Sequence, residues 1–402
     1  MDYDCLLYGG KIITESSVLS PGYIAIQDGV IASLGSDWSS VRAKTTFDVS
    51  NYTVTPGFID MHTHGIMDVD FVEGNFEDIA IGLQNYLAFG VTRVVASTIS
   101  RPLSYVIEQI KCLRRVKEES EYGKIMHGVH LEGPWLAPRC RGGHPLPYLR
   151  VPAKEEVLML LEEVGDIIVT VTFAPELPNA AWLAETLSYR GIVPVIGHTE
   201  ATYEETEEVI LAGARHVTHM YNGMLGYREN PREALVMLPG VETAVLYHDT
   251  VSVELIGCPV HVPPPFFKFI NKVKPRDKRI LVTDSLVGTG KPEGTVLTYR
   301  DGRRIRVAEQ VLRMIDEDPA IDGNLTGSAV TMNLALQRLM KYAGIPLEEA
   351  IDWVTINPAK VLGIDREVGS IAVGKRADLA VVDERLEVKY TFLEGELVFQ
   401  NP

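Results

Sequence analysis

Two histidines separated by one residue stand near the start of the chain, in the stretch Pro56-Gly57-Phe58-Ile59-Asp60-Met61-His62-Thr63-His64. The apolar residues of this stretch predict a short buried strand that begins after the Pro-Gly pair. Because side chains alternate along a strand, Asp60, His62 and His64 project on the same side. Two imidazoles at a strand end can bind one metal ion together, although on this spacing alone a pair of hydrogen-bonded core histidines is an equal alternative.

Four further residues of metal-binding type end other predicted strands: Glu132, His198, His219 and Asp284. In a barrel of alternating strands and helices the carboxyl ends of the strands meet at one rim, so these side chains converge with His62 and His64. Imidazole and carboxylate ligands suit zinc, iron or manganese better than calcium or magnesium. A lone histidine at a strand end is more often structural, but this group of strand-end residues predicts a metal site.

Asp284 follows the apolar run Ile280-Leu281-Val282-Thr283, which would hold its carboxylate near the metal. We predict that it is a general base, which accepts a proton from a metal-activated water and passes it to a leaving group. A further metal ligand and a helix N-cap are the alternative roles. Two more histidines, His144 and His261, stand on loops after the third and seventh strands and are candidates for substrate contact.

The elements that must position these residues alternate between apolar runs and helical patterns, which is typical of βα units around a parallel sheet. The predicted helices include Glu155–Glu163, Ala180–Arg190 and Thr202–Ala212. The predicted strands are Phe58–His64, Val91–Ser97, Gly128–Glu132, Ile167–Phe173, Val193–His198, Ala214–His219, Val251–Ile256 and Ile280–Asp284. We therefore expect an α/β fold, with a (β/α)8 TIM-like barrel over residues 53–366.

Both ends of the chain have β character, but neither has enough apolar surface to fold as a domain alone. We expect residues 1–52 and 367–402 to pair into one small β-sandwich domain beside the barrel. After Asp284, the Gly-rich stretch Gly288–Pro292 predicts a mobile loop, and a polar insertion follows it as far as residue 323.

The composition narrows the class of partner. Lys and Arg number 38 against 54 Asp and Glu, so the net charge is 38 − 54 = −16. This balance argues against nucleic acid or an anionic membrane as the main partner, but it leaves room for an anionic small molecule in a local basic pocket. The chain shows no secretion signal and no apolar run of transmembrane length. Its four cysteines contain no Cys-x-x-Cys pair, which favours free thiols and a cytoplasmic location.

Two strings carry a family resemblance, His130-Leu131-Glu132-Gly133-Pro134 and His219-Met220-Tyr221-Asn222-Gly223-Met224. With Pro56–Gly65 and Gly374–Leu379, they closely resemble the amidohydrolase superfamily and, within it, the N-acetylglucosamine-6-phosphate deacetylases. The two strings are specific to the deacetylase branch, whereas the other stretches are common across the superfamily.

The resemblance implies hydrolysis of the N-acetyl amide of an N-acetylhexosamine 6-phosphate, with N-acetylglucosamine 6-phosphate preferred, to acetate and the amino sugar phosphate. It implies that Glu132, His198 and His219 hold the main metal ion, and that His62 and His64 hold a second with Glu132 as a bridge. One or two divalent transition metal ions are thus expected, with zinc preferred and iron or manganese as alternatives. The nucleophile would be a metal-bound water, with Asp284 as the base and then the acid.

The resemblance also implies substrate contacts and an assembly. The sugar phosphate would be held by Asn222 and the backbone of Gly223, assisted by an arginine, and two histidines would also contact the substrate. The substrate-contacting residues so implied are His144, Asn222, Gly223, Arg228 or Arg232, and His261. In the family a neighbouring subunit completes one face of the site, which implies a homodimer.

Two departures from the family pattern concern substrate recognition. Cys258-Pro259 stands where the family has Asp-Gly before His261, and Tyr227–Arg232 replaces its Arg-Glu-Pro-Gly string. Neither departure touches the metal-binding residues. The alternatives are therefore an amidohydrolase of the same fold that acts on another N-acyl or cyclic amide, and a catalytically silent binding relative. The complete ligand set together with Asp284 argues against a silent relative.

Overall fold

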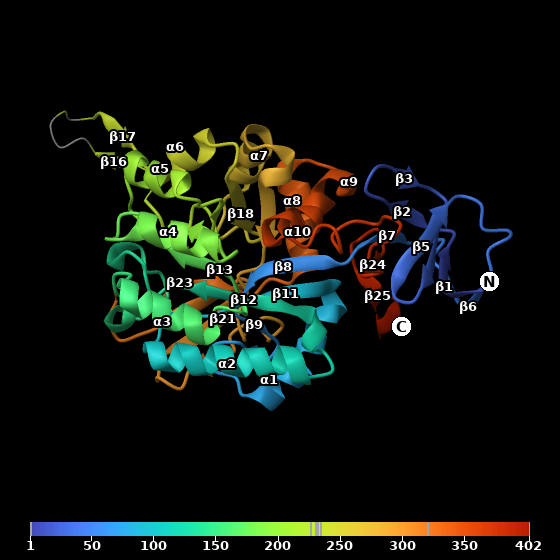
Figure 1. Cartoon of the computed structure of the whole chain (residues 1–402), viewed down its shortest axis with the longest axis horizontal. Helices are drawn as coiled ribbons and strands as arrows, with labels where there is room; N and C mark the ends of the chain where they lie inside the picture. The colour runs from blue at the N-terminus through green and yellow to red at the C-terminus, as the bar shows by residue number, and fades with distance from the viewer. Residues whose placement is uncertain (1, 226, 230–232, 234, 320, 402) are drawn as a thin grey trace.

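The central element is a sheet of eight parallel strands that closes into a barrel (Figure 1). The computed structural model describes residues 2–225, 227–229, 233, 235–319 and 321–401, with the backbone alone for residues 227–229. In spatial order the strands are β8 (Phe58–Thr63), β11 (Val91–Ser97), β12 (Met126–Glu132), β13 (Ile168–Phe173), β14 (Val193–Ile196), β15 (His216–Val217), β18 (Ser252–Ile256) and β19 (Arg279–Val282).

The barrel closes between its first and last strands. The backbone N–H of Asp284 donates to the carbonyl of His62 (2.9 Å), and the N–H of His64 donates to the carbonyl of Ser285 (2.8 Å). Each pair of neighbouring strands is parallel and in sequence order, as expected of successive βα units. The predicted (β/α)8 TIM-like barrel is confirmed.

Four strands end earlier than predicted: β8 ends one residue early, at Thr63, and β14, β15 and β19 end two residues early. His198, His219 and Asp284 each lie two residues beyond the last residue of β14, β15 and β19, so the prediction that they end their strands is wrong. Their φ angles of 49°, 23° and 48° are left-handed, and a residue in that conformation cannot continue an extended ladder. The chain therefore turns at these three residues and directs their side chains across the rim.

The helices lie outside the strands and cover their apolar faces (Figure 1). The main ones are α1 (Phe76–Gly82), α2 (Leu103–Glu119), α3 (Lys154–Val164), α4 (Ala180–Tyr189), α5 (Tyr203–Leu211), α6 (Val241–Tyr247), α7 (Pro264–Val273), α8 (Met332–Ala343), α9 (Leu347–Ala350) and α10 (Ile356–Leu362). Local signals explain their starts: Thr202 and Glu205, for example, form a reciprocal capping box that begins α5. Among the described residues, no helix is long and apolar enough to cross a membrane.

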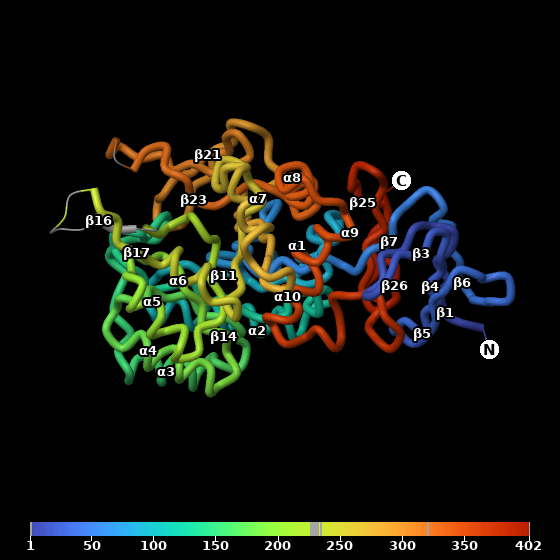
Figure 2. The backbone as a smooth tube through the Cα atoms, turned by 90° about the horizontal axis from the view of Figure 1, so that it is seen from above, coloured from blue at the N-terminus to red at the C-terminus, as the bar shows by residue number. Residues whose placement is uncertain are grey.

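Two sheets at one end of the molecule combine both chain termini (Figure 2). One contains β1 (Tyr3–Tyr8), β4 (Tyr23–Gln27), β5 (Val30–Gly35) and β6 (Ala43–Asp48). The other contains β2 (Lys11–Ile13), β3 (Val18–Leu19), β7 (Thr53–Pro56), β24 (Leu379–Val382), β25 (Val388–Leu393) and β26 (Glu396–Gln400).

Apolar side chains from the two sheets, including Leu7, Ile24, Val54, Leu379 and Phe392, form one buried cluster. We propose that these sheets are a small domain beside the barrel. Strand β7 pairs with β2 and β24, so the first boundary of that domain belongs at the end of β7 rather than at residue 52.

The polar insertion after β19 is an ordered sheet rather than a long loop. It contains β20 (Val296–Thr298), β21 (Arg304–Ala308), β22 (Val311–Ile315) and β23 (Leu325–Ser328), all paired antiparallel. Ile305 and Val307 alternate with exposed arginines and pack with Leu312, Met314 and Leu286. This period-2 burial stabilises the sheet, and a bridge between Ser285 and Ser328 fixes it to the rim of the barrel.

Candidate active site

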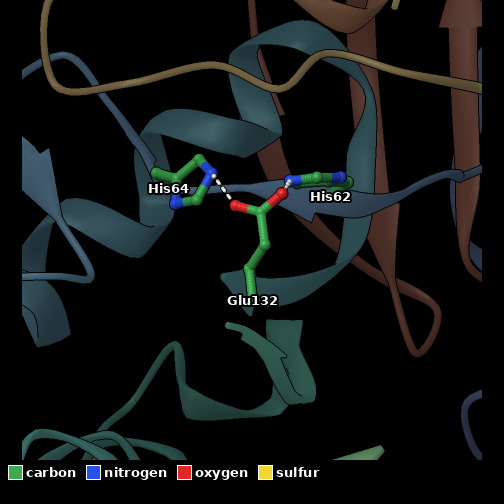
Figure 3. A group of neighbouring side chains, drawn as sticks. All are labelled: His62, His64 and Glu132. Carbon is green, nitrogen blue, oxygen red and sulfur yellow. Dashed lines mark ion pairs between the residues drawn. The ribbon is translucent and has the colours of Figure 1, made fainter. Parts of the chain in front are cut away.

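The carboxylate of Glu132 lies at the centre of the rim, with five imidazoles around it, those of His62, His64, His144, His198 and His219. Its Oε1 lies 3.1 Å from Nε2 of His198, 3.1 Å from Nε2 of His219 and 3.5 Å from Nε2 of His62. Its Oε2 lies 3.3 Å from Nε2 of His64. Figure 3 shows His62 and His64 directed at the two oxygens of this carboxylate. The predicted ligand residues therefore meet at one place.

These residues form two groups whose ligand atoms are close enough to hold one metal ion each. One group is His62, His64 and Glu132, and the other is Glu132, His198 and His219, so the carboxylate is shared. Two of these rings have their outer nitrogen occupied: Nδ1–H of His62 donates to Glu254 Oε1 (2.7 Å), and Nδ1–H of His198 donates to the carbonyl of Cys140 (2.7 Å). Each Nε2 is thereby left to face the site.

The donor set fits a divalent cation. Nε2 of His62 is buried and has no hydrogen-bond partner among the described residues, and the Nε2 atoms of His198 and His219 are only 3.0 Å apart. In neutral rings these nitrogens present lone pairs to one another and to the carboxylate, which is repulsive unless positive charge lies between them. Burial opposes protonation of His64, but Asp284 and Glu132 outweigh it and raise its pKa to about 9. The site therefore attracts positive charge.

Asp284 lies beside the His62 and His64 side of the site. Its Oδ1 is 3.4 Å from Nε2 of His64 and 3.6 Å from Nε2 of His62. Burial alone would raise the pKa of this carboxyl, but the neighbouring His64 and His62 outweigh burial and lower it. Asp284 is therefore ionised near neutral pH and available to accept a proton.

A cavity of about 300 Å³ opens above these residues. The predicted site residues that line it are His64, Glu132, His144, His198, His219, Asn222, Gly223, His261 and Asp284. His62 lies at its base and is completely buried. Two predicted substrate contacts are not among the residues that line the cavity. Arg228 is described by its backbone alone, in β16 (Tyr227–Glu229), and Arg232 lies outside the described residues.

Three polar residues that line the cavity, His144, Asn222 and His261, have side-chain nitrogens that bear on ligand binding. The backbone N–H of Ser100 donates to Nδ1 of His144 (3.1 Å), so the proton of the neutral ring is on Nε2, 3.3 Å from Glu132 Oε2. Burial lowers the pKa of His261 to about 4, which keeps it neutral, and neither of its ring nitrogens has a partner in the described part of the chain. Nδ2 of Asn222 is likewise buried and unpaired among the described atoms. Buried polar groups of this kind require a partner, which a polar ligand can supply.

Three residues of the site were not predicted from the sequence. The carboxylate of Glu254 accepts hydrogen bonds from the rings of His62 and His216. Tyr299 and Arg303, between β20 and β21 of the inserted sheet, line the cavity. A signal existed for Glu254, because it is the single charged residue in the apolar run Val251–Ile256. No local signal identified Tyr299 and Arg303, since the sequence predicted only a polar insertion here and no position for it at the rim. His216 is buried and contacts Glu254 and Ser252.

Comparison with known proteins agrees with this geometry. Residues 53–398 match the model of the amidohydrolase family. The chain is 30% identical over 396 residues to the N-acetylglucosamine-6-phosphate deacetylase of Bacillus subtilis (strain 168), covering 96% of this chain and 95% of that protein. The chain therefore belongs to the amidohydrolase family, and within it this enzyme is similar to the N-acetylglucosamine-6-phosphate deacetylases.

Two further proteins are similar to this chain over nearly its whole length. The N-acetylgalactosamine-6-phosphate deacetylase of Escherichia coli O157:H7 is 28% identical, over 98% of both chains. A solved structure of N-acetyl-D-glucosamine-6-phosphate deacetylase from Mycobacterium smegmatis in complex with N-acetyl-D-glucosamine-6-phosphate superposes with a TM-score of 0.88 at 29% identity. It covers 99% of this chain, and this chain covers all of it. The similarity thus extends over the small domain as well as the barrel.

We predict that Gly223→Ala weakens metal binding at the group Glu132, His198 and His219. A Cβ at Gly223 would lie 2.9 Å from Nδ1 of His198 and 3.2 Å from the carbonyl of Cys140, which are the two atoms of the bond that orients this ring. Loss of such an orienting bond costs about 10–100-fold in metal affinity. Titration of the metal-depleted protein with zinc measures the change.

Gly294→Ala is the matched control for this substitution. Gly294 also has a left-handed φ, of 84°, but its Cβ would meet nothing within 4 Å. Zinc affinity should be unchanged in this variant. Equal affinities in all three proteins would contradict the role given to the bond between His198 and Cys140.

Proposed function

We propose that the protein hydrolyses the N-acetyl amide of an N-acetylhexosamine 6-phosphate, with N-acetylglucosamine 6-phosphate as the preferred substrate, to acetate and the amino sugar phosphate. The observation that carries the proposal is the gathering of Glu132, four imidazoles and the Asp284 carboxylate at the base of one cavity. The similarity to N-acetylglucosamine-6-phosphate deacetylases over the full chain supports the choice of amide.

The residues proposed to hold metal are Glu132, His198 and His219 for one ion and His62, His64 and Glu132 for a second. The imidazole and carboxylate set favours zinc, with iron or manganese as alternatives. When bound, a divalent cation polarises the amide carbonyl and lowers the pKa of the attacking water. Glu132 shares its two oxygens between the groups, which supports two ions rather than one.

Asp284 is proposed to move the proton. Its carboxylate accepts a proton from the attacking water as the new C–O bond forms at the amide carbon. It then donates this proton to the amide nitrogen as the C–N bond breaks, which releases a neutral amine and acetic acid, and the acid loses its remaining proton to solvent to become acetate. Its position beside His62 and His64, and its lowered pKa, support this order of events.

The remaining cavity residues are proposed to recognise the sugar phosphate. Asn222 and the backbone at Gly223 would bind the phosphate, with Arg228 or Arg232 assisting. His144 would donate from Nε2 to an oxygen of the substrate, and His261 would bind a polar group from the opposite side. The unpaired nitrogens of Asn222 and His261 support a polar ligand here.

A galactosamine substrate is the second candidate. The relative from Escherichia coli O157:H7 is an N-acetylgalactosamine-6-phosphate deacetylase, at nearly the same identity as the glucosamine enzymes. The substitution of Cys258-Pro259 for the family's Asp-Gly, next to His261, is the difference that bears on this choice. The two sugars differ only in the orientation of one hydroxyl, so a single altered contact can shift the preference.

The proposed assembly is a homodimer. Strand β16 and β17 (Met237–Pro239) form a hairpin that projects away from the barrel (Figure 1). Leu235 and Met237 on this hairpin are exposed by 104% and 70%. Apolar side chains this exposed favour burial against another surface, here a second copy of the chain. A cytoplasmic location is also proposed, and the free thiols of all four cysteines support it.

An acetate-release assay on purified, metal-analysed protein tests the function. It compares N-acetylglucosamine 6-phosphate, N-acetylgalactosamine 6-phosphate and both unphosphorylated sugars. We expect kcat/KM for N-acetylglucosamine 6-phosphate to exceed that for its unphosphorylated form by at least about 100-fold, because buried groups built for a phosphate are left unpaired without it. No acetate from any of the four, with metal bound, would refute the proposed substrate class.

We predict that Asp284→Asn leaves the metal content unchanged and lowers kcat by about 100- to 10,000-fold, the usual contribution of a general base. The amide has the size of the carboxylate but cannot accept the proton. Metal analysis and acetate release on the same sample separate the two effects. Glu176→Gln is a control, because Glu176 accepts from Thr199 and Glu200 outside the metal groups. Near-normal turnover in Asp284→Asn would rule out this base.

We predict that the double variant Leu235→Asp and Met237→Asp is monomeric under conditions where the unmodified protein is a dimer. Two carboxylates in a buried apolar contact would be left without partners. Light scattering coupled to size exclusion measures the mass. Leu211→Asp, at a residue 78% exposed on α5, should not change it. A dimer that survives the double variant would place the interface elsewhere.

A further inference from the structure

Glu254 is a buried carboxylate that the proposed reaction does not use. It lies on β18, the seventh strand of the barrel, between the apolar residues Val253 and Leu255, and is only 1% exposed. A carboxylate in such a position costs free energy unless every oxygen is paired. The contacts of its two oxygens therefore indicate what it holds.

The first oxygen accepts three hydrogen bonds. Nδ1–H of His62 donates to Oε1 at 2.7 Å, Thr218 Oγ1–H at 2.8 Å, and the backbone N–H of His219 at 2.8 Å. The second oxygen, Oε2, accepts from Nε2 of His216 at 3.0 Å. One carboxylate thus contacts the side chain of a residue in one metal-binding group and the backbone of a residue in the other.

The bond to His62 determines what this ring can do. A carboxylate only accepts, so the proton of the neutral ring is on Nδ1 and the lone pair is on Nε2, which faces Glu132 and Asp284. Among the described residues, the other neighbour of Nδ1 is Thr218 Oγ1 at 3.0 Å, and Glu254 itself holds that hydroxyl. Glu254 therefore fixes both the tautomer and the orientation of His62.

The dependence of the two groups on Glu254 is unequal. His62 is held through its ring, whereas His219 is held only through its backbone, where the N–H of the next residue, Met220, also donates to the main-chain carbonyl of residue 254 (2.9 Å), a bond that does not depend on the side chain at 254. His198, in the same group as His219, is oriented by the carbonyl of Cys140 instead. Loss of the carboxylate should therefore release a ligand of the group His62, His64 and Glu132 and leave the other group largely intact.

We propose that Glu254 is a positioning residue that decides whether the chain holds a second metal ion, the one bound by His62, His64 and Glu132. The inference rests on the proposed metal-dependent function and adds to it the residue on which the second ion depends. Carboxylates that hold the outer nitrogen of a metal-bound histidine typically change metal affinity by about 10–100-fold.

The test is a zinc titration of the metal-depleted, full-length protein, with bound zinc measured after desalting. The unmodified protein should bind two ions per chain. Glu254→Gln should bind the first with unchanged affinity and the second about 10–100-fold more weakly. His64→Asn, which removes a ligand of the second ion only, gives the reference for a one-ion protein.

Asp60→Asn is the matched control. Asp60 is another buried carboxylate on a barrel strand, but it accepts from the hydroxyl and N–H of Thr283 (2.6 and 3.3 Å) and, among the described residues, from no imidazole. This variant should retain two ions, which separates the specific contact to His62 from a general effect of removing buried charge.

Two tightly bound ions in Glu254→Gln would overturn the proposal, as would equal loss of both. If that variant does not fold, Glu254→Asp is tested in its place, because aspartate keeps the charge but its shorter side chain withdraws the carboxylate from His62. Wild-type affinity of Glu254→Asp for both ions would then refute the proposal. Acetate release by the unmodified protein is measured separately. If the proposed substrate is wrong, acetate release fails; if the proposed role of Glu254 is wrong, the zinc titration of its variants fails.

Discussion

The organisation of the molecule depends on the burial of the Glu132 carboxylate among imidazoles. Glu132 is 3% exposed, and burial by itself would raise its pKa, but His62 and the other histidines outweigh burial and hold the pKa well below its usual range. An ionised carboxylate away from water is tolerated only when positive charge or hydrogen bonds surround it. The imidazoles that could share a metal ion with it come from three places on the barrel rim: His62 and His64 from the end of β8, and His198 and His219 from the turns after β14 and β15.

The barrel supplies these residues through the turns that follow its strands. His198, His219 and Asp284 have left-handed φ angles immediately beyond β14, β15 and β19. Such conformations cost of order 1–3 kcal/mol for residues other than glycine and persist where the surrounding structure fixes them. Here the fixing contacts are identifiable: the carbonyl of Cys140 holds the ring of His198, and Glu254 holds the backbone of His219. The left-handed backbone therefore occurs at the residues of the site themselves, because the turn at each of them directs its side chain inward.

The inserted sheet β20–β23 turns this rim into a cavity. Arg303 reaches from the sheet to the carbonyl of Gly143 (2.9 Å), next to His144, and its guanidinium lies over the ring of Tyr299. Arg101, Glu73 and Asp301 form buried or half-buried ion pairs that fix the turn before β21 against the barrel. These contacts anchor this wall of the cavity to the barrel.

The sequence by itself determined the elements and most of the chemistry. Apolar periodicity located all eight strands, and residue type with strand-end position selected His62, His64, Glu132, His198, His219 and Asp284, because these signals are local in the chain. Only the tertiary structure decided which side of each histidine is free, where the strands stop, and that the polar insertion is a sheet. His62 and Glu254 are 192 residues apart, and closure of the barrel, rather than any local pattern, brings them within 2.7 Å. The orientation of a metal ligand is a property of such distant contacts, and for that reason it emerges only with the fold.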